Sequence, residues 1–308
     1  MVFFLGALLL AVLLGYLAQS TGLCMVRGIK EWLGGNPMFM LAILLSGVWA
    51  WVAASTAIFM GGSLPFKVYE ANGWFALGGL LFGLGTAFNQ GCGVSTLSKL
   101  SRGHLQMLAT LAGWIIGWCA LANAELDTAA TELPAPSTLT YVALASLSVA
   151  ITVWALLGDR LRKGLWLGMM GIGLLASFLF LYEPGWTPSG LLHDLSAAAL
   201  HGESTRWPLL PRYYLLLALL GGMILAAWRI KQFEFRFPRW NVWLIHLLAG
   251  ILMGLGAALA MGGNDSQLLL ALPAFSPSGF VTVIAMLIGI ALGVNLYDRL
   301  RLDEGKCA

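Results

Sequence analysis

The sequence predicts an all-α integral membrane protein that crosses the bilayer about nine times. Of the 308 residues, 59% are hydrophobic and only 10% are charged, whereas a soluble domain carries about 25% charged residues. Long stretches contain no Asp, Glu, Lys or Arg, namely residues 1–26, 32–66, 71–98, 133–158 and 266–297. A helix needs about 20 apolar residues to cross a bilayer. Because these runs are continuous and do not alternate with period two, they argue against a β-barrel.

The same composition excludes several classes of function. A mean hydropathy of +0.83 and 38 glycines do not fit a cytosolic enzyme or a disordered chain. The net charge of +3 is too small to indicate polyanion binding, so we expect no nucleic-acid partner. The lipid bilayer is the expected surrounding of this protein.

Nine hydrophobic segments are candidates for membrane-crossing helices. They span residues 2–19, 38–60, 74–90, 105–123, 139–157, 165–182, 213–229, 241–260 and 280–297. The first segment lacks the basic region that precedes the apolar part of a signal peptide, so we interpret it as a retained span.

The distribution of basic residues predicts the orientation. With the N-terminus outside and the C-terminus cytoplasmic, the inside loops are 20–37, 91–104, 158–164, 229–240 and the tail from Asp298. These loops hold 14 of the 17 Lys and Arg residues. Cytoplasmic loops are enriched in Lys and Arg, which supports this orientation. The expected location is a bacterial inner membrane.

The chain resembles itself at an offset of 171 residues. Nine of the 22 positions from 79 to 100 are identical to their counterparts in 250–271, more than shared Gly and Leu content explains. The two copies lie on the third and eighth segments, so they enter the membrane from opposite sides. Such inverted repeats are typical of transporters. We expect one domain of two pseudo-repeats, about 1–124 and 165–297, joined by one extra span near 139–157.

Glycines in the two copies fall into two groups. The pairs Gly79/Gly83 and Gly250/Gly254 have the spacing that lets helices approach closely, so we predict helix packing for them.

The second group of glycines marks the end of each apolar helix, where polar residues follow. It comprises Gly91, Gly93, Gly262 and Gly263. Backbone exposed at membrane depth must face protein or a water-lined cavity. We therefore predict two broken segments that contribute to a pathway.

Two cysteines are candidates for chemistry. Cys24 and Cys92 have small or polar neighbours, and each is followed within a few residues by cations such as Arg27 and Lys99. Nearby cations activate thiols and attract anions. The residues alone leave open a second interpretation, in which both thiols are buried in tight helix ends. We find no Cys-x-x-Cys and no paired His, so we predict neither a metal nor a cofactor.

The second break carries Asn264, Asp265 and Ser266. An acidic residue at membrane depth is a functional candidate, but Asn or Asp also caps helices, here a short apolar helix at about 266–272. Both roles of Asp265 stay open. His246 is expected to hydrogen-bond a neighbouring helix, and residues 191–200 are expected to form a surface helix over the outer opening.

These motifs resemble the YeeE/YedE sulfur-transport family. The resemblance rests on the Gly-Cys-Gly-x-Ser break at 91–95, the Gly-x-Cys-x-x-Arg turn at 22–27, and Gly-Gly-Asn-Asp-Ser at 262–266 with Leu-Pro at 272–273. It covers essentially the whole chain. The resemblance implies an hourglass-shaped permease, not an enzyme, that takes up a small sulfur-containing anion. It also implies that thiols along the axis, here Cys24 and Cys92, pass the anion inward.

The second half departs from the thiosulfate-type pattern. The repeat partner of Cys92 is Gly263, and the counterpart of the first loop, placed around 189–194, has no cysteine. Thiosulfate and related sulfur or selenium species therefore remain open as substrates. The expected substrate-binding residues are Cys24, Arg27, Asn89, Gln90, Gly91, Cys92, Gly93, Ser95, Gly263, Asn264, Asp265 and Ser266.

Two other functions remain open at this point. The chain could be a membrane thiol-disulfide oxidoreductase that uses Cys24 and Cys92. It could also be an accessory subunit whose basic loops at 158–164 and 229–239 dock a cytoplasmic sulfur-carrier protein.

Overall fold

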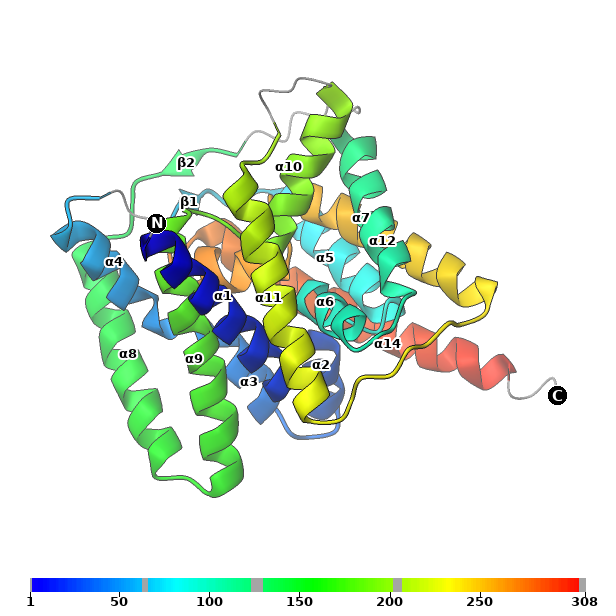
Figure 1. Cartoon of the computed structure of the whole chain (residues 1–308), viewed down its shortest axis with the longest axis horizontal. Coiled ribbons are helices and arrows are strands. Elements are labelled where there is room, and N and C mark those ends of the chain that lie inside the picture. The colour runs from blue at the N-terminus through cyan, green and yellow to red at the C-terminus, as the bar shows by residue number, and fades with distance from the viewer. Residues whose placement is uncertain (1, 63–65, 123–129, 202–206, 305–308) are drawn as a thin grey trace.

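The structure is a computed structural model that describes residues 2–62, 66–122, 130–201 and 207–304. It confirms the all-α class. Within the described residues the strands are β1 (Val68–Tyr69) and β2 (Glu132–Leu133), which form one antiparallel pair. This pair joins two segments that lie between predicted spans. Figure 1 shows the helices as one bundle, with β1 and β2 at its upper edge.

Each predicted hydrophobic segment coincides with a helix or with two helices in line. These are α1 (Val2–Thr21), α3 (Met38–Leu44) with the 3-10 turn η1 (Ser46–Trp49) and α4 (Ala50–Phe59), α5 (Gly73–Phe88), α7 (Met107–Ala122), α8 (Thr138–Leu156), α9 (Arg160–Tyr182), α11 (Leu210–Arg229), α12 (Trp240–Leu259) and α14 (Pro277–Glu304). Four shorter helices lie between them: α2 (Met25–Leu33), α6 (Gly93–Ser101), α10 (Pro188–His201), and α13 (Asn264–Ser266), which continues into the π-helical turn η3 (Gln267–Ala271).

The helices differ in length relative to the thickness of a bilayer. Seven helical segments of the described chain are long and apolar enough to cross a membrane. Helices α5 and α7 have 16 residues each, which corresponds to about 24 Å at 1.5 Å per residue. A bilayer core is about 30 Å thick. These two helices, predicted as ordinary spans, are therefore short, and α5 ends at the first break.

The predicted glycine packing is confirmed. A side-chain carbon at Gly79 or Gly83 would collide with carbonyl oxygens of α14, and one at Gly250 or Gly254 would collide with carbonyl oxygens of α7. Helix α5 thus packs against α14 in the way that α12 packs against α7. Small residues let helix backbones come this close.

Helices α5 and α12 also cross each other through small residues. A Cβ at Gly85 would lie 2.7 Å from the carbonyl oxygen of Ala249, and a Cβ at Gly256 would lie 2.6 Å from that of Gly78. Gly256 is the counterpart of Gly85, and Ala249 that of Gly78, at the same offset of 171 residues. The pairing supports the proposed duplication.

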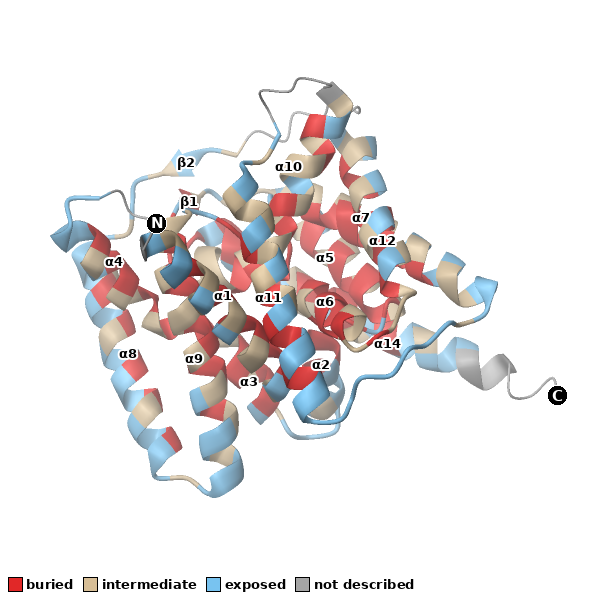
Figure 2. Ribbon diagram, in the orientation of Figure 1, coloured by how far each residue is buried: buried red, intermediate tan, exposed pale blue. Residues whose placement is uncertain are grey.

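The outer helices present apolar surface to the surroundings. On α8 the buried residues are Tyr141, Leu144, Ser148, Ile151 and Ala155, a spacing that defines one helical face. The opposite face exposes large apolar side chains such as Leu139, Val142 and Val149. Figure 2 shows this division between buried and exposed residues along α8. Exposed apolar faces of this kind fit contact with lipid.

The predicted outer loops are more ordered than expected. Residues 191–200 belong to a helix, as predicted, but this helix α10 begins at Pro188. The segment 124–138, which lies between two predicted spans, contains β2, which pairs with β1, and its residues 124–129 lie outside the described residues. Cys307 also lies outside them.

Candidate functional site

The two predicted breaks meet in the interior of the protein. The backbone N–H of Gly93 donates a hydrogen bond of 3.0 Å to Oδ1 of Asn264. The buried ring of Trp114 lies against both breaks. A Cβ built on Gly93 would lie 2.8 Å from the Trp114 ring, and a Cβ built on Gly263 would lie 3.0 Å from the same ring. We call Gly93, Trp114, Gly263 and Asn264 the junction. Glycine is required at both positions while Trp114 keeps its place.

Each break begins with the same backbone turn. Gln90 has φ of 53° and its counterpart Met261 has φ of 55°, a left-handed conformation that residues other than glycine rarely adopt. A glycine follows in both cases. A Cβ at Gly91 would lie 2.6 Å from the hydroxyl of Ser95, and a Cβ at Gly262 would lie 2.7 Å from the side chain of Ser266. The turns end α5 and α12 and bring each serine against its glycine.

A buried polar network holds the first break in place. Nδ2 of Asn89 donates to the carbonyl of Gly91 (2.7 Å) and to Oγ1 of Thr96 (2.8 Å). Oδ1 of Asn89 accepts from the hydroxyl of Thr110 (2.7 Å) and lies 2.8 Å from Nδ1 of His246. His246 therefore bonds a neighbouring helix, as predicted. Asn89 was predicted to bind substrate, but its side-chain amide hydrogen-bonds the groups that hold the break in position.

The two candidate cysteines lie side by side. Cys24 precedes α2 and Cys92 precedes α6, and their thiols are within hydrogen-bonding reach of each other. The Ser95 side chain is also within reach of the Cys24 thiol. Both thiols are free. Cys92 is fully buried and Cys24 is half-buried, so Cys24 separates Cys92 from the space beyond.

That space is a cavity of about 360 Å³, which we call the thiol cavity. Its wall combines Cys24 and Ser95 with the cations Arg27, Lys99 and Arg102. Segments from three loops predicted to lie inside, 20–37, 91–104 and 229–240, contribute to the wall, which supports their predicted common side.

The thiol cavity carries an excess of positive charge. Nζ of Lys99 donates to the carbonyl of Gln90 (2.7 Å), and among the ion pairs of the described residues none involves Lys99. Arg27 is paired with Glu31 at 2.7 Å. Nη1 of Arg102 lies 3.4 Å from an uncharged amide oxygen, that of Gln232. A cavity lined by one sign of charge raises the local concentration of the opposite ion, here an anion.

The carboxylate of Asp265 is used for structure. It is buried, and its Oδ2 accepts from the backbone N–H of Ser189 (2.9 Å) while its Oδ1 accepts from that of Ser266 (3.0 Å). Ser189 lies in the first turn of α10, so Asp265 caps a helix that is distant in sequence. The short helix after the second break was expected to be capped by an Asn or Asp. Its N-cap is Gly263 instead.

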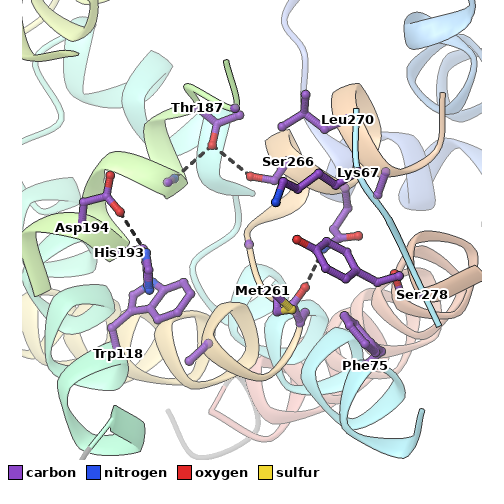
Figure 3. A pocket seen from close by; sticks show the side chains of 18 of the residues that line it. Lys67, Phe75, Trp118, Thr187, His193, Asp194, Met261, Ser266, Leu270 and Ser278 are labelled. Atoms are coloured by element: carbon purple, nitrogen blue, oxygen red, sulfur yellow. Dashed lines mark hydrogen bonds and ion pairs between the residues drawn. The ribbon is translucent and has the colours of Figure 1, made fainter. Parts of the chain in front are cut away.

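A second cavity lies on the other side of the junction. It also measures about 360 Å³ and is lined by Thr187, Ser266, Gln267 and the cations Lys67 and Arg212, among others. We call it the hydroxyl cavity. Figure 3 shows Thr187 and Ser266 joined by a hydrogen bond on its wall. Thr187, Lys67 and Arg212 were not among the predicted site residues.

One sequence signal could have identified Thr187. Gly22-Leu-Cys24 follows α1, and Gly185-Trp-Thr187 follows α9; the two glycines have φ of 65° and 72°. Thr187 thus stands where Cys24 stands in the first half. The counterpart predicted around 189–194 therefore lies a few residues earlier in the chain.

The predicted site residues therefore divide into four groups. Cys24, Arg27 and Ser95 line the thiol cavity, with Cys92 behind Cys24. Ser266 lines the hydroxyl cavity. Gly93, Gly263 and Asn264 form the junction, while Asn89, Gln90, Gly91 and Asp265 hold the two breaks in shape.

Comparison with known proteins identifies the relatives of this chain. Residues 160–292 match the sulphur transport family. That match agrees with the family that the motifs resemble. The chain is also similar to the thiosulfate transporter TsuA of Escherichia coli (strain K12), with 21% identity over 336 aligned positions that cover 93% of this chain and 92% of TsuA. The sulphur transport family match includes α9 to α12, the second break and most of α14. Family and relative are membrane transporters, and not enzymes.

Proposed function

We propose that this chain is a permease that takes up a small sulfur-containing anion, thiosulfate or a related sulfur or selenium species. The observation that carries the proposal is the pair of adjacent thiols, Cys24 and Cys92, beside a cation-lined cavity at the junction of two broken helices. The similarity to TsuA, a thiosulfate transporter, supports the same class of substrate.

The thiol cavity suits the passage of such an anion. Lys99, Arg27 and Arg102 draw it in electrostatically. Thiol S–H groups are weak hydrogen-bond donors, so Cys24 and Cys92 hold an anion loosely and release it readily. The buried Nδ2 of Asn264 has no hydrogen-bond partner and offers a further donor at the junction.

Transport requires the junction to open. The thiol cavity and the hydroxyl cavity lie on either side of Trp114 and the hydrogen bond from Gly93 to Asn264. We propose that movement of these groups connects the cavities alternately. The loop charges support an orientation in a bacterial inner membrane with the thiol cavity on the cytoplasmic side, and we propose that transport is inward. A cytoplasmic sulfur-carrier protein remains a predicted partner at that side.

The oxidoreductase alternative is not favoured. The family and the similar protein are transporters.

Uptake of labelled thiosulfate into proteoliposomes tests the proposal. Cys24→Ala and Cys92→Ala are expected to abolish most of the uptake. Cys119→Ala is the matched control, since Cys119 lies on α7 and its thiol donates to the carbonyl of Ser196 on α10. Uptake that is unchanged in both cavity variants would rule out the thiol route, and no uptake of any sulfur anion by the parent protein would rule out the permease.

A further inference from the structure

Three hydroxyl groups form a compact cluster beside the second break. The Oγ1 of Thr187 lies 2.9 Å from Oγ of Ser266 and 3.3 Å from Oγ of Ser189, and the two serine oxygens are 3.0 Å apart. We call these three residues the hydroxyl cluster. Thr187 and Ser266 line the hydroxyl cavity, and Ser189 lies behind them. The cluster comes from two segments that are more than 70 residues apart.

The hydroxyl cluster corresponds to the thiol site of the first half. Thr187 takes the place of Cys24, because each ends a loop that starts with a left-handed glycine and leads into a short helix. Ser266 is the counterpart of Ser95 at the 171-residue offset. The contact between Thr187 and Ser266 therefore repeats the contact between Cys24 and Ser95.

Ser189 occupies the space of the missing third thiol. The counterpart of Cys92 is Gly263, and a Cβ built on Gly263 would lie 2.9 Å from Cβ of Ser189. The Ser189 hydroxyl also accepts from the backbone N–H of Gly263 at 3.1 Å. A hydroxyl from another segment has thus filled the position to which a cysteine side chain would project.

The protons of the cluster are available to a ligand. Thr187 Oγ1 accepts from the backbone N–H of Gly190 (3.0 Å), and Ser189 Oγ accepts from that of Gly263. The fixed N–H donor on Thr187 Oγ1 leaves its O–H free to rotate, whereas the Ser189 hydroxyl is also hydrogen-bonded to the carboxylate of Asp265. A ligand oxygen in the cavity can therefore replace one of the hydrogen bonds within the cluster.

The charges around the cavity largely cancel, and the buried carboxylate of Asp265 lies close to the hydroxyl cluster. Arg212 is balanced by Glu183 and Asp194. Lys67 is exposed and shares a 3.3 Å ion pair with the equally exposed Glu132. Such a pair is screened by solvent, so Lys67, which points into the cavity in Figure 3, adds a modest attraction. Most of the recognition falls to the neutral hydroxyl donors.

We propose that Thr187, Ser189 and Ser266 form a second binding site, which holds the oxygen atoms of a small sulfur oxyanion on the opposite side of the junction from Cys24 and Cys92. For its ligand class this inference rests on the proposed function. Hydroxyl groups make short, strong hydrogen bonds to anionic oxygen, whereas thiols donate weakly. The site therefore selects anions that carry oxygen, such as thiosulfate and sulfite, over hydrosulfide.

Binding to the purified full-length protein in nanodiscs tests the inference separately from transport. The parent for all measurements carries Cys24→Ala and Cys92→Ala, so that the thiol site makes no contribution. Titration calorimetry with thiosulfate, sulfite and hydrosulfide should show binding of the first two ligands only. Adding Ser266→Ala should weaken sulfite binding about tenfold, the effect of losing one hydrogen bond to a charged group.

The control is Ser196→Ala, which removes an α10 hydroxyl that donates to the Leu192 carbonyl and should leave sulfite affinity unchanged. Thr187→Ser, which keeps the hydroxyl and the contact with Gly190, should retain affinity, and Thr187→Cys should reduce it. Should Thr187→Cys fail to fold, Ser266→Ala against Ser196→Ala decides the question. Equal sulfite affinity in Ser266→Ala and its parent, or hydrosulfide binding as tight as sulfite binding, overturns the inference. Unchanged uptake in the cysteine variants with sulfite binding intact overturns only the thiol route.

Discussion

The backbone N–H of Gly93 donates a hydrogen bond of 3.0 Å to Oδ1 of Asn264, the residue that occupies the equivalent position in the second half of the chain. This bond joins the two broken segments directly, at the one place where both also touch Trp114. The thiol cavity borders the first break and the hydroxyl cavity borders the second, so we expect this contact to lie between them. The stability of the junction and the rate of transport should therefore depend on the same few atoms.

Replacing Asn264 with Ala should destabilise the protein. The change leaves the buried N–H of Gly93 without an acceptor, which costs about 1–3 kcal/mol. Thermal unfolding of the purified protein measures the loss. Asn72→Ala, which removes the N-cap of α5, provides a helix-capping comparison with an expected cost of about 1 kcal/mol. An Asn264→Ala variant as stable as the parent would show that the hydrogen bond between Gly93 and Asn264 contributes little to stability.

Replacing Gly93 with Ala should block transport. The added Cβ would lie 2.8 Å from the Trp114 ring and 2.9 Å from Oδ1 of Asn264, and overpacking of this kind costs about 1–3 kcal/mol. Because the contact is to the outer atoms of the indole, adding Trp114→Phe should restore part of the stability and the uptake. Proteoliposome uptake and thermal unfolding of both variants provide the measurements. The steric explanation is wrong if the double variant is no better than Gly93→Ala.

The two cysteines should differ in reactivity. Cys24 lines the thiol cavity, whereas Cys92 is fully buried behind it, so a small anionic thiol reagent should modify Cys24 first. Thiosulfate should slow the modification by occupying the cavity. Mass spectrometry of time-resolved labelling in a Cys119→Ala background measures both effects. Equal rates at the two cysteines, or no protection by thiosulfate, would contradict this arrangement.

Removing the charge of Lys99 should weaken substrate capture. Lys99→Gln eliminates a cation on the cavity wall that has no carboxylate partner among the described ion pairs, so KM for thiosulfate should rise about tenfold or more, as expected for one charged hydrogen bond. Lys30→Gln, an exposed position on α2 outside the cavity wall, should leave KM near its original value. A similar change of KM in both variants would indicate a general effect of net charge.

Stability should fall as the pH decreases from 7 to 5, in part because of His104. Burial and the neighbouring Arg236 and Arg102 lower the pKa of His104, so the unfolded chain binds a proton near pH 6.5 that the folded protein resists. Its contribution is present above the unfolded pKa and is lost as the pH falls below it. His104→Gln should flatten the acid side of a stability curve measured by thermal unfolding. An unchanged curve would exclude His104 as a source of the pH dependence.

Much of the architecture follows from local pattern. Apolar runs predicted the positions of the helices, and glycine spacing predicted the contacts of Gly79 and Gly250 with neighbouring helices. Both signals are local, because burying backbone in lipid requires helices and close packing requires small residues. The positions of the two breaks were predicted for the same reason.

The roles of individual polar residues were harder to predict. Asp265 caps α10, which is more than 70 residues away in the sequence. The side-chain amide of Asn89 hydrogen-bonds backbone and side-chain groups around the first break. The pairing of β1 with β2 was not predicted either. Each depends on a partner that only the packing of distant segments supplies.

The sequence by itself determined the membrane class, the helix positions, the two broken segments and the two candidate thiols, because hydropathy and glycine placement act over short stretches of chain. Only the tertiary structure decided that Cys24 meets Cys92, that Asn264 bridges to Gly93, and that Ser189 fills the place of an absent cysteine. These are contacts between segments tens to hundreds of residues apart. They form because the packed helices bring the loop ends together. A local sequence pattern cannot predict contacts between such distant segments.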